Sequence, residues 1–403
     1  MPGTAAFRRS VEEHAAALAP LLAPLRERAA ETIPLEAAHG RATTGDVVTP
    51  VPLPLFRNSQ MDGVAVRSAD VARAPVLLRL SAAESAAGAG SPPPLVPGMA
   101  MRIMTGAPMP AGADAVIPVE ETKLGDGVVE ILRARGAGEY VREPGSDLPA
   151  GATLLAAGTR LGSRQLAALA AAGLDRVAVR SRPRIAVIST GSELVAPGER
   201  PRPGELFDAN GVALAAAIVE AGGAVVHRAR VRDEPERLRA ELDAALAAGA
   251  ELVVTSGGVS MGEHEVVRET LEPAGALVGS VAMQPGGPQG HGEWRGAPVL
   301  CFPGNPVSSQ LSLELFLAPL LREIAALPAA RVTRERVAGP IRSVAGKRQY
   351  LRGRRAADGR VAPLGGPGSH LVAALAAAEL LLVVPEEAVE LTEDETVEVR
   401  WLS

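Results

Sequence analysis

The residues with the clearest capacity for chemistry form a glycine- and serine-rich stretch, Leu252–Glu265. This stretch begins with the apolar run of a buried strand, turns at Gly257–Gly258, and leads into a helix that we expect after Gly262. Glycines let the backbone turn tightly, and the free N–H groups at the start of a helix attract anions. Glu263 and Glu265 lie just beyond, so a phosphate or another oxyanion could be bound beside a divalent cation or a proton. The alternative is an ordinary turn between a strand and a helix, in which the glycines only permit the turn.

Two further loops of small residues, Ser189–Leu194 and Pro303–Ser309, also follow expected strands. All three loops lie in a region where strands and helices alternate. We expect strands at 185–189, 224–231, 252–255, 277–283 and 298–302, and helices at 210–221, 235–248, 265–271 and 307–326. This alternation predicts a doubly wound α/β domain with a mostly parallel sheet. Such sheets bind ligands at the carboxyl ends of their strands, so we expect the three loops to converge on one site.

The rest of the chain predicts smaller domains around this sheet. Three prolines within Thr49–Pro54 force an extended backbone and indicate a domain boundary. After it, short strands alternate with clusters of glycine and proline, which predicts a β domain inserted into a discontinuous linking domain. The expected domains are the linking domain at 1–50 and 146–180, the inserted β domain at 51–145, the α/β domain at 181–328, and a C-terminal β-barrel at 329–403.

The N-terminal segment, Met1–His14, has no apolar core of the kind found in signal peptides. Ser10–Glu13 has the spacing of a capping box, so a peripheral helix is expected there, with a stop or kink at Pro20 and Pro24. The longest apolar run, Leu371–Pro385, is too short to span a membrane and contains a glutamate. We therefore expect a cytoplasmic protein that does not bind membranes.

The composition favours a globular protein of two to four domains, with 403 residues, 47% hydrophobic and 22% charged. A net charge of -5 and an aromatic content of 2% argue against a nucleic-acid binder. The only lysines are Lys123 and Lys347, so arginine, hydroxyls or backbone N–H groups must bind any anion. Cys301, the single cysteine, lies in an apolar strand and is expected to be buried there.

The expected inserted domain has candidate residues of its own. Asp62–Gly63 is either a hairpin turn or the place of a catalytic or metal-binding carboxylate. Arg102–Pro110 reads as a strand that ends in a Thr-Gly turn, for which plain turn chemistry is the alternative. The loop Val141–Asp147 combines a guanidinium with two carboxylates, and would bind a ligand if it lined a cleft.

Taken together, these motifs resemble those of the molybdopterin molybdenumtransferases, the family that includes the E domain of gephyrin. The resemblance covers nearly the whole chain, in order. Its motifs are Met61–Gly63, Arg102–Pro110, Arg142–Asp147, Ser189–Leu194, Thr255–Glu263 and Pro303–Ser309. The resemblance implies that molybdenum from molybdate is inserted into adenylylated molybdopterin with the help of Mg²⁺, giving molybdenum cofactor and AMP. Molybdenum would then be held by the dithiolene sulfurs of the substrate.

The resemblance also implies roles for individual residues. Asp62 matches the essential acidic residue of the family, and Glu193, Asp233 and Glu265 match further functional carboxylates. Thr105 completes the predicted catalytic set, and Asp62, Glu193 and Glu265 are the predicted magnesium ligands. The predicted substrate-binding residues are Arg142, Thr190, Gly191, Ser192, Asp208, Asn210, Ser256, Gly257, Gly258, Ser260, Gly262, Gln284, Pro303, Gly304, Asn305, Ser308 and Ser369.

Members of the resembled family form homodimers whose active site joins the sheet domain of one subunit to the Met-Asp-Gly loop of the other. A molybdopterin adenylyltransferase is the expected source of the substrate. Two other hypotheses stay open: a homologue that binds pterin or nucleotide, or acts as a scaffold, without inserting metal, and a general nucleotide-binding α/β protein. The last leaves the Met-Asp-Gly and Met-Thr-Gly-Ala-Pro motifs unexplained.

One segment departs from the family pattern. Where well-known relatives have Lys-Pro-Gly-Lys-Pro near the molybdate site, this chain has Gln284–Pro288, without a lysine. A charge-assisted hydrogen bond is stronger than a neutral one, so the loss of two ammonium groups predicts a substitute. We expect Gln284 and the neighbouring backbone to contribute, with Arg295 or Arg348 as the source of positive charge.

Overall fold

The computed structural model describes residues 7–260 and 265–402. The chain forms two compact units. The first, called the sheet unit here, comprises Met1–Glu31, Gly40–Ala42 and Val179–Ser403. The second, called the β unit, comprises Thr32–His39 and Thr43–Ala178.

A seven-stranded sheet organises the sheet unit, in the order β1-β19-β21-β22-β18-β14-β17. Its strands, in that order, are Arg8–Arg9, Leu277–Val281, Pro288–Trp294, Ala297–Phe302, Leu252–Ser256, Arg184–Thr190 and Ala224–Val231. The pairs β17-β14, β14-β18 and β18-β22 are parallel, and β21 is antiparallel to both of its neighbours. The helices of this region are α1 (Val11–Leu22), α3 (Ala209–Glu220), α4 (Pro235–Ala247), α5 (Val266–Leu271), α6 (Pro306–Phe316) and α7 (Ala318–Ile324).

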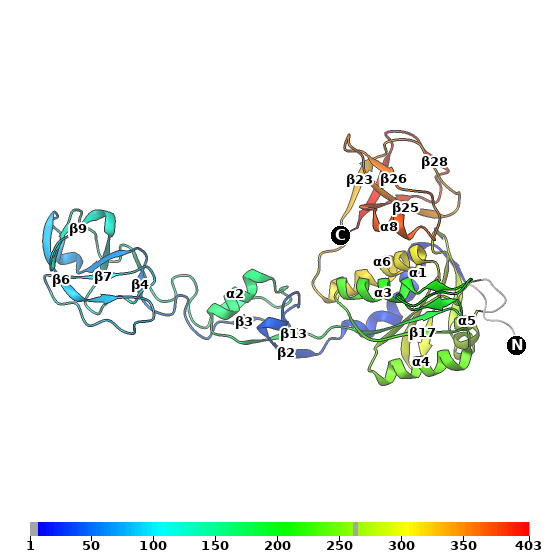
Figure 1. The fold of residues 1–403 in the computed structure, drawn as a ribbon, viewed down its shortest axis with the longest axis horizontal. Helices are drawn as coiled ribbons and strands as arrows, with labels where there is room; N and C mark the ends of the chain where they lie inside the picture. The colour runs from blue at the N-terminus through cyan, green and yellow to red at the C-terminus, as the bar shows by residue number, and fades with distance from the viewer. Residues whose placement is uncertain (1–6, 261–264, 403) are drawn as a thin grey trace. The chain divides into compact units, whose positions relative to one another are not determined.

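Alternate residues of the central strands pack on opposite faces of this sheet, as the period of a strand requires. Leu252 and Val254 pack in the core formed with α1, α3, α6 and α7, whereas Val253 packs in the core formed with α4 and α5. Figure 1 shows α3 and α4 on opposite sides of the sheet. Because both faces are covered, the middle residues of β14, β18 and β22 are apolar on both faces.

Local signals explain where several helices begin. The Ser10–Glu13 capping box is present, since the Ser10 hydroxyl accepts a hydrogen bond from the Glu13 N–H and the Glu13 carboxylate accepts one from the Ser10 N–H. Asp208 caps α3 by accepting a hydrogen bond from the Gly211 N–H. Proline occupies the first position of α4 and α6, where its missing N–H costs no helical hydrogen bond.

The structure differs from the predicted elements in several places. The helix expected at 307–326 is two helices, because the backbone leaves helical geometry at Leu317. Strand β21 was not predicted, since Pro288–Trp294 carries two glycines and no β-branched residue. Helix α1 continues through Pro20 to Leu22 and is not peripheral, because Leu18 and Leu22 are buried in the core of the sheet unit.

The N-terminal residues therefore group differently from the prediction. We placed residues 1–50 in one domain with 146–180, but Met1–Glu31 belongs to the sheet unit. The physical reasons are the buried face of α1 and the parallel pairing of β1 with β19. The other predicted domain boundaries stay predictions.

The β unit is built around a six-stranded sheet in the order β8-β5-β7-β6-β10-β9. Its strands, in that order, are Ala115–Pro118, Gly63–Val66, Met99–Ile103, Val76–Ser85, Val128–Ile131 and Thr122–Leu124. Two apolar clusters lie against this sheet, one around Val64 and Ile117 and one around Met101 and Val116. The remaining elements between residues 30 and 180 are β2 (Ala30–Pro34), β3 (Val47–Val48), β4 (Asn58–Ser59), β11 (Val141–Arg142), β12 (Thr153–Leu155), α2 (Ser163–Ala171) and β13 (Arg176–Arg180).

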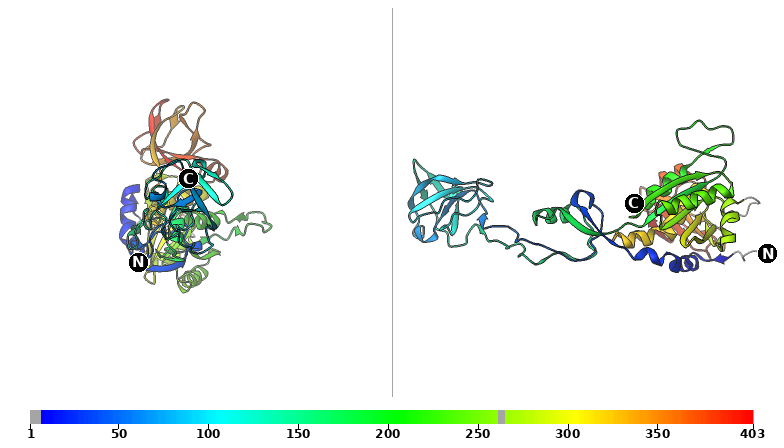
Figure 2. Two further views of the ribbon diagram at one scale, coloured as in Figure 1. Left: turned by 90° about the vertical axis from the view of Figure 1, so that its left-hand side faces the viewer. Right: turned by 90° about the horizontal axis from the view of Figure 1, so that it is seen from below.

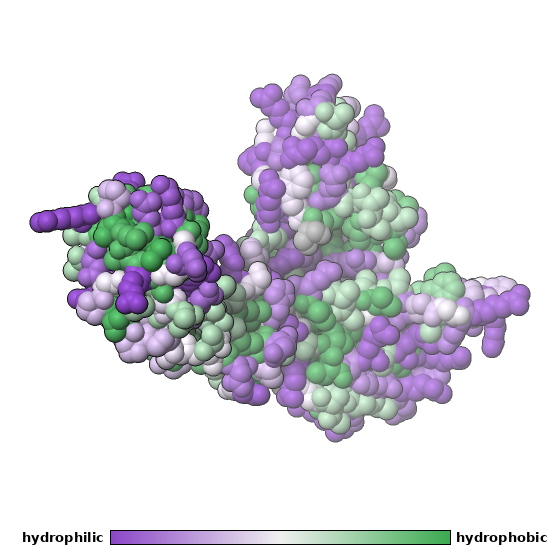
Figure 3. Space-filling view, turned by 60° about the vertical axis from the view of Figure 1, so that its left-hand side comes forward, coloured by the Kyte–Doolittle hydropathy of each residue, from purple (hydrophilic) through white to green (hydrophobic). Residues whose placement is uncertain are grey.

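The C-terminal part of the sheet unit is rich in β-structure, with a core around Leu382 and Val399. Figure 3 shows mainly hydrophilic side chains on the visible surface of this part. Its main sheet has the order β20-β25-β27-β29-β23, and β26 also pairs with β25. The elements are β20 (Met283–Gln284), β23 (Val332–Arg336), β24 (Ile341–Arg342), β25 (Arg348–Arg355), β26 (Val361–Pro363), α8 (Val372–Ala376), β27 (Leu380–Val384), β28 (Glu390–Leu391) and β29 (Thr396–Trp401).

The predicted fold class is confirmed by the doubly wound, mostly parallel sheet and the β-rich C-terminal part. No helix within residues 7–260 and 265–402 has the length and apolar character needed to cross a membrane.

Candidate functional site

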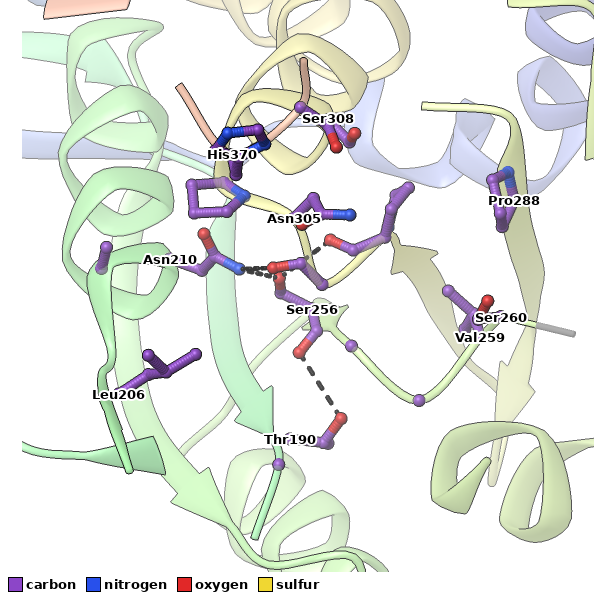
Figure 4. Close-up of a pocket in the computed structure, with 18 of the residues that line it drawn as sticks. Thr190, Leu206, Asn210, Ser256, Val259, Ser260, Pro288, Asn305, Ser308 and His370 are labelled. Atoms are coloured by element: carbon purple, nitrogen blue, oxygen red, sulfur yellow. Dashed lines mark hydrogen bonds between the residues drawn. The ribbon is translucent and has the colours of Figure 1, made fainter. Parts of the chain in front are cut away.

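A cavity of about 1100 Å³ opens where β14, β18 and β22 end. Its walls come from the three small-residue loops of the sheet unit, at Thr190–Leu194, Ser256–Ser260 and Pro303–Ser308. Figure 4 shows these loops around it. We call it the strand-end cavity. It lies where ligands bind in open α/β sheets.

A buried network of polar side chains joins the loops behind this cavity. The Asn210 amide Nδ2 donates to the Ser256 hydroxyl at 2.8 Å and to the Gly304 carbonyl at 2.7 Å, as Figure 4 shows. The Ser256 hydroxyl also lies 3.2 Å from the Pro303 carbonyl and 3.0 Å from the Ser309 hydroxyl. Asn210 Oδ1 is buried and has no partner among the described residues.

Two glycines allow the loop after β18 to lie close to the loop after β14. Gly257 has a φ of 100°, and a Cβ there would lie 2.5 Å from the Thr190 carbonyl oxygen. Gly258 has a φ of 66°, and a Cβ there would lie 2.9 Å from the Val267 backbone nitrogen. A side chain at either position would both strain the backbone and collide with it.

The N-termini of two helices line the cavity, through Ala209 and Asn210 of α3 and Pro306 and Ser308 of α6. Unpaired N–H groups and the helix dipole make such ends favourable for anions. We had expected the helix after Gly262 to supply this feature. Helix α5 instead begins at Val266 and has only 6 residues, and both Gly262 and Glu263 lie outside the described residues.

Four carboxylates line the cavity: Glu193, Asp208, Asp233 and Glu265. Asp208 caps α3, and Asp233 Oδ2 accepts a hydrogen bond of 2.8 Å from the Ser192 N–H. The carboxylate of Glu193 lies against the Gly191 backbone, 2.6 Å from where a Cβ would stand. The described residues contain no group of three His, Cys, Asp or Glu side chains arranged to hold a metal ion.

Most of the predicted residues of the sheet unit line this one cavity. They are Thr190, Gly191, Glu193, Asp208, Asn210, Asp233, Ser256, Gly257, Gly258, Ser260, Glu265, Gln284, Pro303, Gly304, Asn305, Ser308 and Ser369. Ser192 lines a neighbouring cavity instead. Asp62, Thr105 and Arg142 belong to the β unit and are not among the lining residues.

Asp62 is fully exposed in the β unit and is oriented by Thr105. The Thr105 N–H donates to Asp62 Oδ1 at 2.6 Å, and the Thr105 hydroxyl donates to the same oxygen at 2.9 Å. These bonds, the backbone bond first, hold the pKa of the Asp62 carboxyl below its usual value. Asp62 Oδ2 accepts no hydrogen bond from the described residues, so an oriented, ionised oxygen faces solvent.

Arg142 is exposed on β11, which pairs with β4. The carboxylate beside it, Glu143, is bound by Arg57 at 2.8 Å. The loop therefore presents Arg142 to solvent, while Arg57 partly neutralises Glu143.

Sequence reasoning missed several parts of the cavity wall. Leu206 and Phe207 are exposed at its edge, on a two-residue strand, β16, that pairs with β15 (Leu194–Val195). Pro367, Gly368 and His370 of the C-terminal part, on either side of the predicted Ser369, also line it. Neither segment follows a strand of the main sheet, so strand periodicity could not place these residues at the site.

The expected charge donors Arg295 and Arg348 are wrong, because neither lines the cavity. Arg295 pairs with Asp243 at 2.7 Å, and Arg348 pairs with Glu12 and Glu386. Gln284 does line the cavity, and its Oε1 accepts a hydrogen bond of 2.7 Å from Gln349.

Another arginine lies close behind this part of the wall. Arg352 is 1% exposed and donates from Nη2 to the Gly366 carbonyl, next to the lining residue Pro367. Its Nε and Nη1 have no partner among the described residues. Burial lowers the pKa of Arg352, but an arginine keeps its charge in proteins.

Comparison with known proteins places this site in a family. The MoeA N-terminal region (domain I and II) matches residues 9–173, a family described as "Probable molybdopterin binding domain" matches 186–323, and the MoeA C-terminal region (domain IV) matches 334–402. The "Molybdopterin molybdenumtransferase 2" of Mycobacterium tuberculosis (strain ATCC 25618 / H37Rv) is 42% identical over 399 residues, 95% of this chain and 96% of that protein. "Molybdopterin molybdenumtransferase 1" of the same strain is 38% identical over 431 residues, 98% of this chain and 99% of that protein.

A solved structure of a molybdopterin biosynthesis MoeA protein from Pyrococcus horikosii has the same fold. The two chains superpose with a TM-score of 0.80 at 32% identity, over 98% of this chain and 99% of that one. The site is thus that of a MoeA-type protein of molybdenum cofactor biosynthesis. The chain belongs to the molybdopterin molybdenumtransferase family, a family of transferases, and the resemblance seen in the sequence is confirmed.

Proposed function

We propose that this protein inserts molybdenum from molybdate into adenylylated molybdopterin and releases AMP and molybdenum cofactor. The observation that carries the proposal is the strand-end cavity, in which three backbone-rich loops meet two helix N-termini in a chain of this family. Phosphate groups and a tetrahedral oxyanion need many N–H and hydroxyl donors and few bulky side chains. The loops supply such donors, with Ser256, Ser260 and Ser308 among the lining residues.

Magnesium is the cofactor that we propose for this step. Mg²⁺ in nucleotide-handling sites binds to one or two carboxylates, to substrate phosphates and to water, so it needs no complete cage of protein ligands. Glu193 and Glu265 both line the cavity and fit that requirement. When bound, Mg²⁺ neutralises charge on the phosphate whose bond to the pterin moiety is broken.

We further propose a homodimer in which Asp62 of one subunit acts at the strand-end cavity of the other. The support is the state of Asp62, an exposed carboxylate with one oxygen fixed by Thr105 and the other without a partner among the described residues. A carboxylate whose pKa is held low stays ionised and suits metal binding. A cytoplasmic location and an adenylyltransferase that supplies the substrate complete the proposal.

The experiment is to incubate the purified protein with adenylylated molybdopterin, Mg²⁺ and molybdate, and to follow AMP release. We expect AMP to appear only when molybdate and Mg²⁺ are both present. Absence of AMP release, or release that ignores molybdate, overturns the proposal.

A second candidate function is pterin or nucleotide binding without metal insertion. It is favoured by the Gln284 side chain, which lines the cavity without a charge and is already bound to Gln349. For the enzyme, Gln284→Lys should lower the molybdate concentration needed for half-maximal AMP release about two- to tenfold, because a charge-assisted hydrogen bond replaces a neutral one. Tight binding of the adenylylated substrate with no AMP release, in both the native protein and this variant, would favour the second function.

A further inference from the structure

A second cavity of about 420 Å³ lies beside the strand-end cavity. One side is formed by the loop 196–205 between β15 and β16, which Figure 2 shows in green, projecting from the sheet unit. The other side is formed by the end of β17 and the first turn of α4. We call it the arginine cavity, because its lining includes Arg200, Arg202, Arg230, Arg232 and Arg237.

The positive charge around this cavity is only partly balanced. Three carboxylates line it as well, at Glu199, Glu205 and Glu241. Glu199 lies 3.9 Å from Arg230, and Glu205 lies 4.0 Å from Arg202, so both ion pairs are at the limit of contact. Glu241 is bound instead by His227, at 2.8 Å. Arg237 is bound at 2.5 Å by Glu234, which does not line the cavity. The other four guanidinium groups thus face three carboxylates that pair with them weakly or not at all.

The side chains of two of these arginines have no ionic or hydrogen-bonding partner among the described residues. They are Arg200, on the loop, and Arg232, just after β17. Arg200 belongs to the loop side of the cavity and Arg232 to the sheet side, so both sides carry positive charge. Without an anion between them, these two charges repel each other. A bound polyanion would remove that repulsion, and the planar guanidinium group is well suited to bind phosphate oxygens in pairs.

Ser192 and Asp233 link the arginine cavity to the strand-end cavity through two hydrogen bonds. Ser192 lines the former and Asp233 the latter. The Ser192 N–H donates to Asp233 Oδ2 at 2.8 Å, and the Asp233 N–H donates to the Ser192 hydroxyl at 3.0 Å. Gly191 and Leu194 line both cavities, so the loop that carries Glu193 forms their common wall.

We propose that the arginine cavity is a binding site for a phosphate-bearing anion, held between Arg200 of the loop and Arg232 of the sheet edge. The shared chemistry is that of a phosphate group. It has two possible sources: a free phosphate compound, and the phosphate of a nucleotide whose base lies in the strand-end cavity. Binding fixes the loop 196–205 against β17 and α4, and with it the wall that carries Glu193.

The test is calorimetric titration of the full-length protein with inorganic pyrophosphate and, separately, with AMP. We expect pyrophosphate to bind the native protein, and Arg200→Gln with Arg232→Gln to weaken this binding about tenfold or more, because two charge-assisted contacts are lost. The matched control is Arg334→Gln with Arg342→Gln, which removes the same charge from exposed positions of the C-terminal part and should leave the affinity unchanged.

The second variant needed is Asn210→Ala, which alters only the strand-end cavity. AMP binding weakened by both Asn210→Ala and the Arg200/Arg232 pair identifies the nucleotide as the source, and AMP binding untouched by the arginine pair identifies a free phosphate compound. No pyrophosphate binding by the native protein overturns the proposal. So does pyrophosphate binding that Asn210→Ala abolishes while the folded arginine variant retains it. The AMP-release assay is scored separately, so the proposed function does not depend on this result.

Discussion

The carboxylates of the two units are held in different ways. In the sheet unit, Asp208 and Asp233 line a large cavity, but each already accepts a hydrogen bond from the backbone that shapes its loop. In the β unit, Asp62 is exposed, has one oxygen fixed by Thr105, and keeps the other oxygen without a partner among the described residues. In the proposed reaction the sheet unit supplies the binding space and the β unit supplies the carboxylate of Asp62, so the proposal requires both units.

The largest effect is expected from Asp62→Asn. The amide has nearly the same shape and can still accept the hydrogen bonds from Thr105, but it has no charge for a metal ion or a proton. We expect AMP release to fall by about 100-fold or more, the usual effect of losing such a group. The control is Asp126→Asn, in an exposed turn between β9 and β10 of the same sheet. AMP release near the native rate would show that Asp62 is only a turn residue. The proposed difference in role between the two units would then be wrong.

Mixed dimers test whether the two units act across subunits. Chains carrying Asp62→Asn, isolated in mixed dimers with chains carrying Glu193→Gln, should regain about half of the native AMP-release rate, since one of two symmetric sites is intact. The measurement compares these dimers with each parent homodimer. Lack of any recovery would mean that both groups act within one chain.

A smaller effect is expected from Thr105→Val. The variant loses the hydroxyl bond to Asp62 Oδ1 and keeps the backbone bond. Since these bonds lower the pKa of Asp62, that pKa should rise toward its ordinary value, and the acid limb of the pH–rate profile should move to higher pH. We expect a loss of about two- to tenfold in AMP release at acidic pH, of the size that one hydrogen bond contributes. A profile that keeps its shape would show that Thr105 does not act through Asp62.

The smallest effect concerns stability in acid and should be confined to the sheet unit. Burial is the main cause that lowers the pKa of His14 to about 3 and that of His291 to about 4. Both rings face each other at 5.6 Å, beside Phe7 and Phe316. Their neutral forms are favoured by the fold, so this stability is complete above the unfolded pKa of about 6.5 and is lost as the pH falls toward 4 and 3.

Tryptophan fluorescence measures this effect, because Trp294 and Trp401 are the only tryptophans and both lie in the sheet unit. The unfolding temperature of the sheet unit should fall by several degrees between pH 7 and pH 4.5. The variant His14→Phe should show a smaller fall, since one titrating group is removed. The β unit, in which His39 is exposed, provides the comparison by circular dichroism. An equal acid sensitivity of His14→Phe and the native chain would count against the histidine pair.

The sequence alone predicted those parts of the fold and site whose structure follows from the local pattern of apolar residues and glycines. The apolar runs and glycines around Leu252–Ser256 predicted both a buried strand and the loop that follows it, and the structure has both. Strand β21 could not be predicted, because its neighbours β19 and β22 stabilise a glycine-containing segment with no strand propensity of its own. Helix α1 shows a capping signal, but the burial of Leu18 and Leu22 depends on long-range packing.

Most residues that line the strand-end cavity could be predicted for the same reason. The prediction failed where long-range contacts, not local pattern, bring a residue to the cavity. Glu193 follows β14, Asn210 lies in the first turn of α3, and Ser256 ends β18, so the topology of the mostly parallel sheet brings them together. Phe207 and His370 reach the cavity from a side loop and from the C-terminal part, where no periodic signal applies. The charge donor was misplaced because ion pairing with Asp243, Glu12 and Glu386 occupies Arg295 and Arg348.

The short strand β20 has a consequence for the evolution of the chain. Met283 and Gln284 pair with Arg348 and Gln349 of β25, although β21 of the main sheet begins at Pro288. The segment that carries a cavity residue is thus a strand of the C-terminal sheet. Loss of the C-terminal part would leave an unpaired strand edge beside the cavity, where another chain could add to it. An exchange of the C-terminal part between relatives would therefore have to restore this backbone pairing with Met283–Gln284.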